Sequence, residues 1–342
     1  MDDREKRILS GPAWLALLSV LLVAGFLVSF SLGRYPVPFR ELIGILFSRL
    51  KFLNIEQYWT DIQYTAVWNI RMPRIVMAVL VGACLASAGC AYQGVFQNPM
   101  AAPDILGASA GAGFGAALAI FLGLSSWWIT GFAFGMSLVT VMLVMLVSRY
   151  AKGEKVLGLV LAGIMVSSLF QAGTSFIKLT ADPTNKLPAI TYWLMGSLAG
   201  ATNDEVGFAV WPMAAGLVPL MLLRWRMNVL ALGDDDARSM GVNAGRVRAA
   251  VIVSATLITA ASVSVSGMIG WVGLVIPHMM RRLVGSDFRW LMPASAIGGG
   301  LFLLIVDNIS RNISGAEIPI GILTAFIGAP FFLLLITRRT GT

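Results

Sequence analysis

The sequence has little charge for its length. Asp, Glu, Lys and Arg make up 12% of its 342 residues, whereas they make up about a quarter of an average soluble protein, and 57% of the residues are hydrophobic. So few charged side chains could not give a globule of this size a soluble surface. The sequence also lacks a low-complexity tract, a domain linker and a convincing internal repeat. We therefore expect one membrane domain over residues 1–342 and exclude an ordinary soluble protein.

Cysteine and histidine are equally scarce. Cys84 and Cys90 lie within one apolar run without a CxxC motif, so we interpret them as packing residues. His278 is the single histidine and has no second ligand at metal-binding spacing. No GxxxxGK[ST] loop occurs, so this chain is not expected to hydrolyse a nucleotide in the P-loop manner. We predict no catalytic residue, no metal ligand and no cofactor bound by this chain.

Long apolar runs dominate the sequence. Runs of about 18 to 22 residues match the length that a helix needs to cross the hydrocarbon core of a membrane. Helices are expected because lipid cannot satisfy the hydrogen bonds of an open backbone. The unambiguous candidate spans are Ala13–Leu32, Met72–Tyr92, Ile105–Leu124, Trp127–Val147, Leu157–Ile177, Val206–Leu223, Leu291–Ile309 and Ile318–Ile336.

The number of spans depends on the stretch from Ala249 to Met280, which is too long for one ordinary helix and short for two. Two helices give ten spans and place 16 of the 25 basic residues in the cytoplasm, whereas one helix divides them 12 inside and 13 outside. The positive-inside rule favours ten helices with both termini in the cytoplasm. The same rule explains the net charge of +8 without nucleic-acid binding, because the basic residues form no continuous face.

Three connecting segments carry their own patterns. The outer loop, residues 33–69, contains FRELIGILFSRL, whose helical spacing of apolar residues predicts an interfacial helix. A second outer segment, Leu179–Thr202, is expected to form a short helix that does not span. The longest inner loop covers residues 227–248. In it, Asp234 is a good N-cap after Gly233, Gly241 is placed to stop the helix, and Asn243 could cap another turn.

That inner loop has two open interpretations: a solvated loop with a short helix, or a helix that receives force from a separate ATPase. Asp307 is the carboxylate that lies well inside a predicted span, and we favour a structural pair with Arg311, four residues later, over a proton relay. Polar residues gather on one face of the fifth span. Spacing alone leaves helix packing and the wall of a water-filled path equally open for this face. Its members are Ser167, Ser168, Gln171, Thr174 and Ser175.

Four long blocks carry a resemblance to a known family. They are RMPRIVMAVLVGACLASAGCAYQGVFQNPMAAPDILGASAGAG from Arg71, ALGDDDARSMGV, GMIGWVGLVIPHMMRRLVGSD and DNISRNISGAEIPIGILTAFIGAPFF. Together they resemble the FecCD-type permeases of binding-protein-dependent ABC importers for ferric siderophores, haem and cobalamin. The resemblance runs from Arg71 to Phe332 and is weak in the first span and its outer loop.

The resemblance implies an all-α fold of about ten transmembrane helices, the type II ABC importer permease fold. It implies a permease dimer, expected to be a homodimer, two ATP-binding subunits that bind ATP and Mg, and a periplasmic or lipid-anchored solute-binding protein. Arg71, Arg74 and Arg311 match arginines that pair with acidic residues of the binding protein. The residues that match the ATPase-coupling segment are Leu232, Gly233, Asp234, Asp235, Ala237, Arg238 and Gly241.

The path itself is implied to lie along the fifth span and along the tenth, where Gly321 and Thr324 lie. The chain departs from some relatives at KGEKVLG, where they place small hydroxyl residues at an inner constriction; Val156 and Leu157 could form an apolar constriction instead. We expect a multi-pass protein of the bacterial inner membrane that imports a ferric siderophore by ATP-driven alternating access. Haem, cobalamin or an oxyanion are the alternative cargoes, and an ion-coupled secondary transporter is the alternative class.

Overall fold

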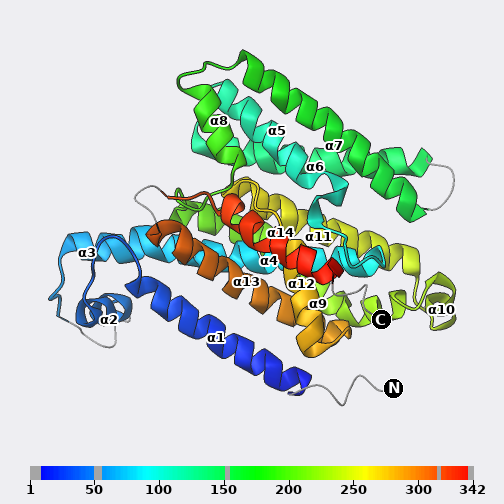
Figure 1. Ribbon diagram of the computed structural model, residues 1–342, viewed down its shortest axis with the longest axis horizontal. Coiled ribbons are helices and arrows are strands. Elements are labelled where there is room, and N and C mark those ends of the chain that lie inside the picture. Colours follow the sequence, from blue (N-terminus) through cyan, green and yellow to red (C-terminus); the bar gives the residue numbers. More distant parts are fainter. Residues whose placement is uncertain (1–8, 50–55, 151–154, 314–316, 338–342) are drawn as a thin grey trace.

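Every regular element in the part of the chain that the structure describes is a helix (Figure 1). The structure is a computed structural model, and it describes residues 9–49, 56–150, 155–313 and 317–337. The helices are α1 (Gly11–Ser31), α2 (Phe39–Phe47), α3 (Asp61–Thr65), α4 (Met72–Val95), α5 (Ala108–Phe121), α6 (Ser126–Tyr150), α7 (Lys155–Thr180), α8 (Lys186–Leu194), α9 (Asn203–Leu230), α10 (Asp234–Ser239), α11 (Ala244–Ser266), α12 (Val272–Val284), α13 (Phe288–Asn312) and α14 (Ile320–Thr337).

The predicted all-helical fold is confirmed, and a helix lies at each of the ten predicted span positions. Seven helical segments of the described residues are long and apolar enough to cross a membrane, and they contain α1, α4, α6, α7, α9, α11 and α13. The shorter helices α5, α12 and α14 occupy the other three predicted positions. Each of the predicted outer-loop helices is also present, as α2 and α8.

The ambiguous apolar stretch does contain two helices. Backbone φ is +67° at Gly267, where α11 ends, and +70° at Trp271, just before α12 begins. A side chain at Gly267 would place its Cβ 2.3 Å from the carbonyl oxygen of Trp193, so close packing also requires glycine there. The two helices that the charge count favours are therefore confirmed, and the break divides one long apolar run into a long helix and a short one.

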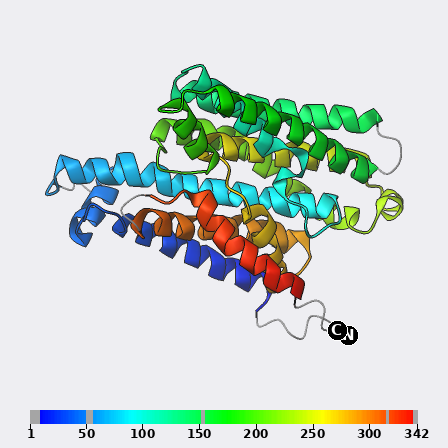
Figure 2. The ribbon, with the colours of Figure 1, turned by 45° about the horizontal axis from the view of Figure 1, so that its top comes forward.

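Helix α4 lies at the centre of the molecule, between the layer that contains α1 and α13 and the layer that contains α9 and α11 (Figure 2). Small residues let its neighbours approach closely. A Cβ on Gly82 would lie 2.2 Å from the carbonyl oxygen of Gly299 in α13, and a Cβ on Gly89 would lie 1.7 Å from that of Gly273 in α12. Backbone contact of this kind holds membrane helices together because lipid gives little hydrophobic drive for association.

The two ends of the bundle differ. Helices α2 and α3 lie at one end, and α10 lies at the other, where α1 begins and α14 ends (Figure 1). In α2, Leu42 and Ile45 are buried against the bundle, whereas Phe39 and Phe47 are exposed. This division leaves an apolar face on α2, as an interfacial helix needs.

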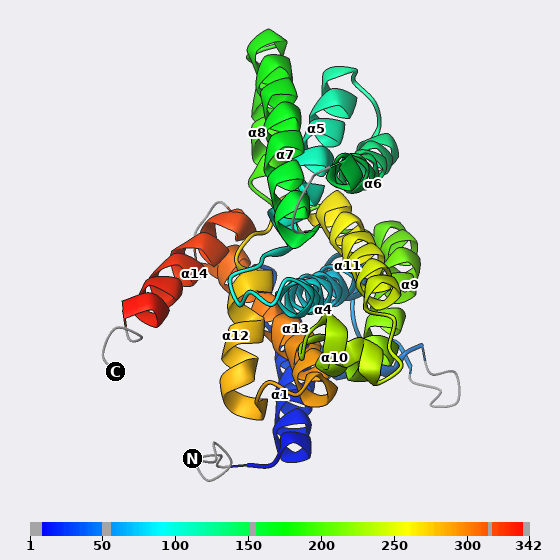
Figure 3. The same ribbon diagram turned by 90° about the vertical axis from the view of Figure 1, so that its right-hand side faces the viewer.

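Helix α14 is attached at its beginning. The Ser310 hydroxyl donates to the Ile318 carbonyl at 2.6 Å, and the backbone N–H of Ile320 donates to the Gly196 carbonyl at 2.8 Å. Seen end-on, α14 and α7 leave the bundle in different directions (Figure 3). The side of the molecule between these two helices carries the cavities described below.

Candidate functional site

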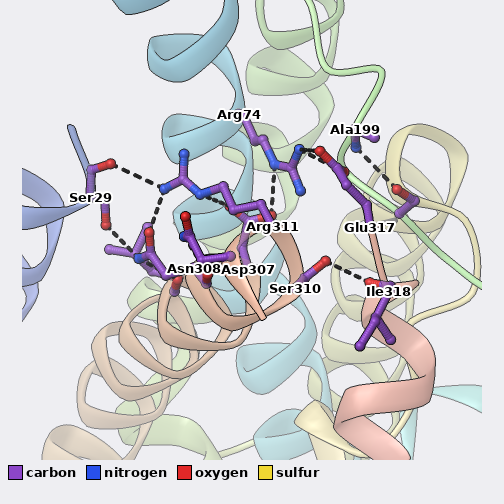
Figure 4. Close-up of polar contacts among 12 residues, drawn as sticks. Ser29, Arg74, Ala199, Asp307, Asn308, Ser310, Arg311, Glu317 and Ile318 are labelled. Atoms are coloured by element: carbon purple, nitrogen blue, oxygen red, sulfur yellow. Dashed lines mark hydrogen bonds and ion pairs between the residues drawn. The ribbon is translucent and has the colours of Figure 1, made fainter. Parts of the chain in front are cut away.

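Four charged side chains meet at the α3 end of the bundle (Figure 4). Arg74, at the start of α4, donates from Nε to Asp307 Oδ1 at 2.8 Å and from Nη1 to the Glu317 carboxylate at 3.0 and 2.9 Å. Arg311 Nε lies 3.6 Å from the second oxygen of Asp307. Asp307 is fully buried, whereas the Glu317 side chain is 27% exposed. These four residues form the charge cluster.

The sequence predicted one pair of this cluster. The ion pair of Asp307 with Arg311 is confirmed, since the two lie one turn apart on α13. The sequence did not reveal Arg74 as a partner of Asp307 because the two are distant in the chain. It did not reveal Glu317 as a member of the cluster because this residue lies beyond the end of α13. One signal could have linked these residues: Asp307 is a carboxylate inside a span, and Arg74 is predicted at the same end of the bundle.

The arginines matched to the docking role are buried, not open. Arg71, Arg74 and Arg311 are 5%, 6% and 6% exposed. Arg71 ends a π-helical turn, Ala66–Arg71, and its guanidinium donates to the backbone carbonyls of Phe30 and Tyr35. Burial in an apolar bundle requires each guanidinium to find acceptors within the chain. The docking role remains a prediction, and the partly exposed Glu317 is the member of the cluster most accessible to another protein.

Two cavities open between α7 and α14. The α14 cavity has a volume of about 660 Å³ and is lined by residues of α14, including Gly321, Ile322 and Phe326. The α7 cavity has a volume of about 730 Å³ and is lined by residues of α5 and α7. Both are bordered by Asp104, Ser109, Leu194 and Met268. Because they share this wall, we refer to the two cavities together as the groove.

The polar face predicted on the fifth span borders this groove. All five residues of that face line the α7 cavity: Ser167, Ser168, Gln171, Thr174 and Ser175. Three of the hydroxyls, those of Ser168, Thr174 and Ser175, donate to carbonyl oxygens one turn earlier on α7, at 2.8 to 2.9 Å. Spacing left two interpretations of this face open, helix packing and the wall of a water-filled path. Its position beside the α7 cavity favours the wall of a path.

The other residues assigned to the path are placed differently. Gly321 lines the α14 cavity, and its lack of a side chain lets the Met195 carbonyl approach. Thr324 is fully buried, and its hydroxyl donates to the Gly321 carbonyl at 3.1 Å, so its side chain does not face the groove. Val156 is half-buried and packs against the main core, whereas Leu157 is 54% exposed. Neither is among the groove residues that the structure describes, and their role at a constriction remains a prediction.

The inner loop forms a short helix between two glycines. Gly233 (φ +118°) precedes α10, and Gly241 (φ +75°) follows it. The N-cap is Gly233, so the prediction that Asp234 caps the helix is wrong; Asp234 is its first residue. The other caps are confirmed, because Gly241 adopts the left-handed conformation after α10 and the Asn243 side chain accepts from the Arg246 N–H at 3.0 Å.

The buried and exposed residues of this loop define its outer face. Ala237 is fully buried, whereas Leu232 and Met240 are exposed by 61% and 54%. Arg238 and Asp235 are also exposed, 3.9 Å apart. The loop thus presents an apolar and charged surface at the end of the molecule opposite the charge cluster.

Comparison with known proteins gives consistent results. Residues 21–338 match the model of the FecCD transport family. The chain is 38% identical to the molybdate import system permease protein MolB of Haemophilus influenzae, over 96% of each chain. It is 36% identical to the cobalamin import system permease protein BtuC of Halobacterium salinarum, also over 96% of each. A solved structure of a metal-chelate type ABC transporter in an inward-facing conformation is 37% identical, with a TM-score of 0.85 over 96% of this chain and 99% of that one. The chain belongs to the FecCD transport family and is a multi-pass permease of an ABC importer.

Proposed function

We propose that this permease carries a chelated-metal nutrient, with a ferric siderophore as the favoured cargo, along the groove by ATP-driven alternating access. The observation that carries the proposal is the groove, which has a polar wall on α7 and an apolar wall on α14. A chelate that presents both apolar and polar groups matches such walls. The named relatives import molybdate and cobalamin, so family membership leaves haem, cobalamin and an oxyanion as alternative cargoes.

The partners follow from the two ends and the open side. A second copy of the chain would close the groove, and two ATP-binding subunits would contact the α10 loop. A solute-binding protein would dock at Arg71 and at the two arginines of the charge cluster, Arg74 and Arg311. In a bacterial inner membrane, α10 and both termini would then lie in the cytoplasm. The positive-inside count supports this orientation. ATP and Mg would be bound by the partner ATPase.

Replacing Gly241 by valine should uncouple ATP hydrolysis from transport. A valine at φ +75° is strained. A Cβ at this position would meet no atom within 4 Å, so the substitution acts through backbone strain in the loop and not through a steric clash. We expect uptake of a radioactive ferric siderophore into proteoliposomes to fall at least about fivefold while ATP hydrolysis by the assembled complex continues, the fold-change corresponding to about 1 kcal/mol of strain.

The control is Gly123→Val, which also has a positive φ and open space but lies in a loop distant in sequence from α10. Equal losses of uptake from both variants, or normal coupling in Gly241→Val, would remove the assignment of α10. Uptake that needs this chain and an ion gradient but no ATPase, and that resists vanadate, would favour a secondary transporter instead.

Glu317→Gln should strengthen docking of the binding protein. In the charge cluster, the Glu317 carboxylate accepts hydrogen bonds from Arg74, as a carboxylate of a docked partner would. Removing its negative charge leaves Arg74 with less in-chain compensation, so we expect several-fold tighter binding with a steeper salt dependence. The measurement is titration of the assembled complex with its binding protein at two salt concentrations. Unchanged affinity would place docking elsewhere; Glu205→Gln, at the start of α9, serves as the control.

A further inference from the structure

Asp104 occupies the point at which the two cavities meet. It lies in the 3₁₀ turn Pro103–Leu106 that connects α4 to α5, and its side chain is exposed and borders both the α7 cavity and the α14 cavity. Ser109, at the start of α5, donates its hydroxyl to Asp104 Oδ1. That hydrogen bond fixes one carboxylate oxygen and leaves Oδ2 available to the groove. Desolvation raises the pKa of the Asp104 carboxyl, and the hydrogen bond from Ser109 opposes that shift.

Charge is otherwise sparse along the groove. Of the described residues that line it, the other charged one is Lys178, which borders the α7 cavity alone. Within the described part of the chain, Asp104 has no ion-pair partner. The remaining polar lining is made of neutral hydroxyl and amide groups. A carboxylate between low-dielectric walls therefore sets the electrostatic potential at the centre of the groove.

We propose that Asp104 is a specificity-determining residue, which favours cargo with positive charge or hydrogen-bond donors and disfavours free oxyanions. The inference rests on the proposed function of the groove as the path. Two copies of the chain facing each other would bring two such carboxylates to one path, as acidic rings do in cation-selective channels. This role of Asp104 distinguishes the alternative cargoes. A chelate with amide, hydroxyl or ammonium donors can donate a hydrogen bond to Oδ2, whereas the negative charge of molybdate is repelled by the carboxylate.

A thiol-reactivity experiment tests the charge at this point without knowledge of the cargo. Ser168, on the α7 wall, is replaced by cysteine in the assembled complex, and the rates of its modification by cationic and anionic methanethiosulfonates of similar size are compared. Cys84 and Cys90 are 1% and 0% exposed, so the native cysteines give a silent background. Asp104→Asn should lower the cation-to-anion rate ratio by roughly threefold or more, because the two reagents respond to the potential in opposite directions.

Three further variants keep this experiment decisive. Asp104→Glu retains the charge and should retain the ratio, and Asp104→Ser provides a second neutral side chain should the Asn variant fail to fold. Asp204→Asn removes an exposed acid from the first turn of α9 and should leave the ratio unchanged. A ratio that is the same in the parent and in both neutral variants overturns the proposal. A cysteine at Ser168 that reacts with neither reagent overturns the groove as a water-accessible path and with it the proposed function.

The consequence for cargo is tested with one ferric trihydroxamate in two forms, with its terminal ammonium free or succinylated to a carboxylate. Vesicles containing the complex should take up the ammonium form in preference, and Asp104→Asn should reduce that preference by roughly threefold or more. Equal preference in both proteins overturns the role of Asp104 while leaving the importer intact. If the parent moves neither chelate nor molybdate, the proposed function fails, and the thiol ratio still decides the charge of the groove.

Discussion

Asp307→Asn should cause a large loss of stability, about 3 kcal/mol in the free energy of unfolding. Its carboxylate lies between Arg74 and Arg311 with no exposed surface, so neutralising it leaves two buried guanidiniums with less compensation. Arg74 would keep Glu317, but Arg311 would lose its ion pair within the described residues. The measurement is unfolding of the purified permease in mixed micelles, followed by circular dichroism.

The matched control is Asp235→Asn. This variant also breaks an aspartate–arginine pair whose members lie about one helical turn apart. Both side chains are largely exposed, Asp235 by 100% and Arg238 by 72%. Exposed pairs of this kind contribute little. We expect no measurable change in the control. Equal losses from the buried and the exposed pair would show that the charge cluster does not stabilise the bundle.

Gly82→Ala should also destabilise the permease strongly, by about 3 kcal/mol or more. The added Cβ would lie 2.2 Å from the Gly299 carbonyl oxygen, so α4 and α13 must move apart along their contact. Backbone cannot move aside as a flexible side chain can. The expected result is a lower unfolding midpoint and a lower yield of folded protein after detergent extraction.

Gly135→Ala is the comparison for that variant. Gly135 lies in the middle of α6, and a Cβ there would meet no atom within 4 Å. The same glycine-to-alanine change should then leave stability unchanged or raise it slightly through helix propensity. A loss from Gly135→Ala as large as that from Gly82→Ala would mean that close helix approach is not the cause.

Local patterns in the sequence predicted the fold well. Hydrophobic length located the spans, and the charge count distinguished ten helices from nine before Gly267 was seen to end α11. The caps at Gly241 and Asn243 were also predictable, since capping depends on a few adjacent residues. Gly233, not Asp234, is the N-cap because α10 begins one residue earlier than predicted, and the φ of +118° at Gly233 favours glycine there.

The site was less predictable because its contacts join distant segments. Nothing local in the sequence connects Arg74 to Asp307 or Glu317, and nothing local places Asp104 between two cavities. The polar face of α7 was visible as a periodicity. Its assignment to a path wall required the neighbouring helices, because the same spacing serves packing between helices.

The hydroxyls of α7 have a consequence for recognition. Ser168, Thr174 and Ser175 each commit their proton to a carbonyl of their own helix, so toward the groove they offer lone pairs. With the free oxygen of Asp104, this wall is rich in acceptors and poor in donors. A passing molecule must therefore supply most of the protons for its own hydrogen bonds, and one that carries only oxygen acceptors would depend on Ser167, Gln171 and Lys178.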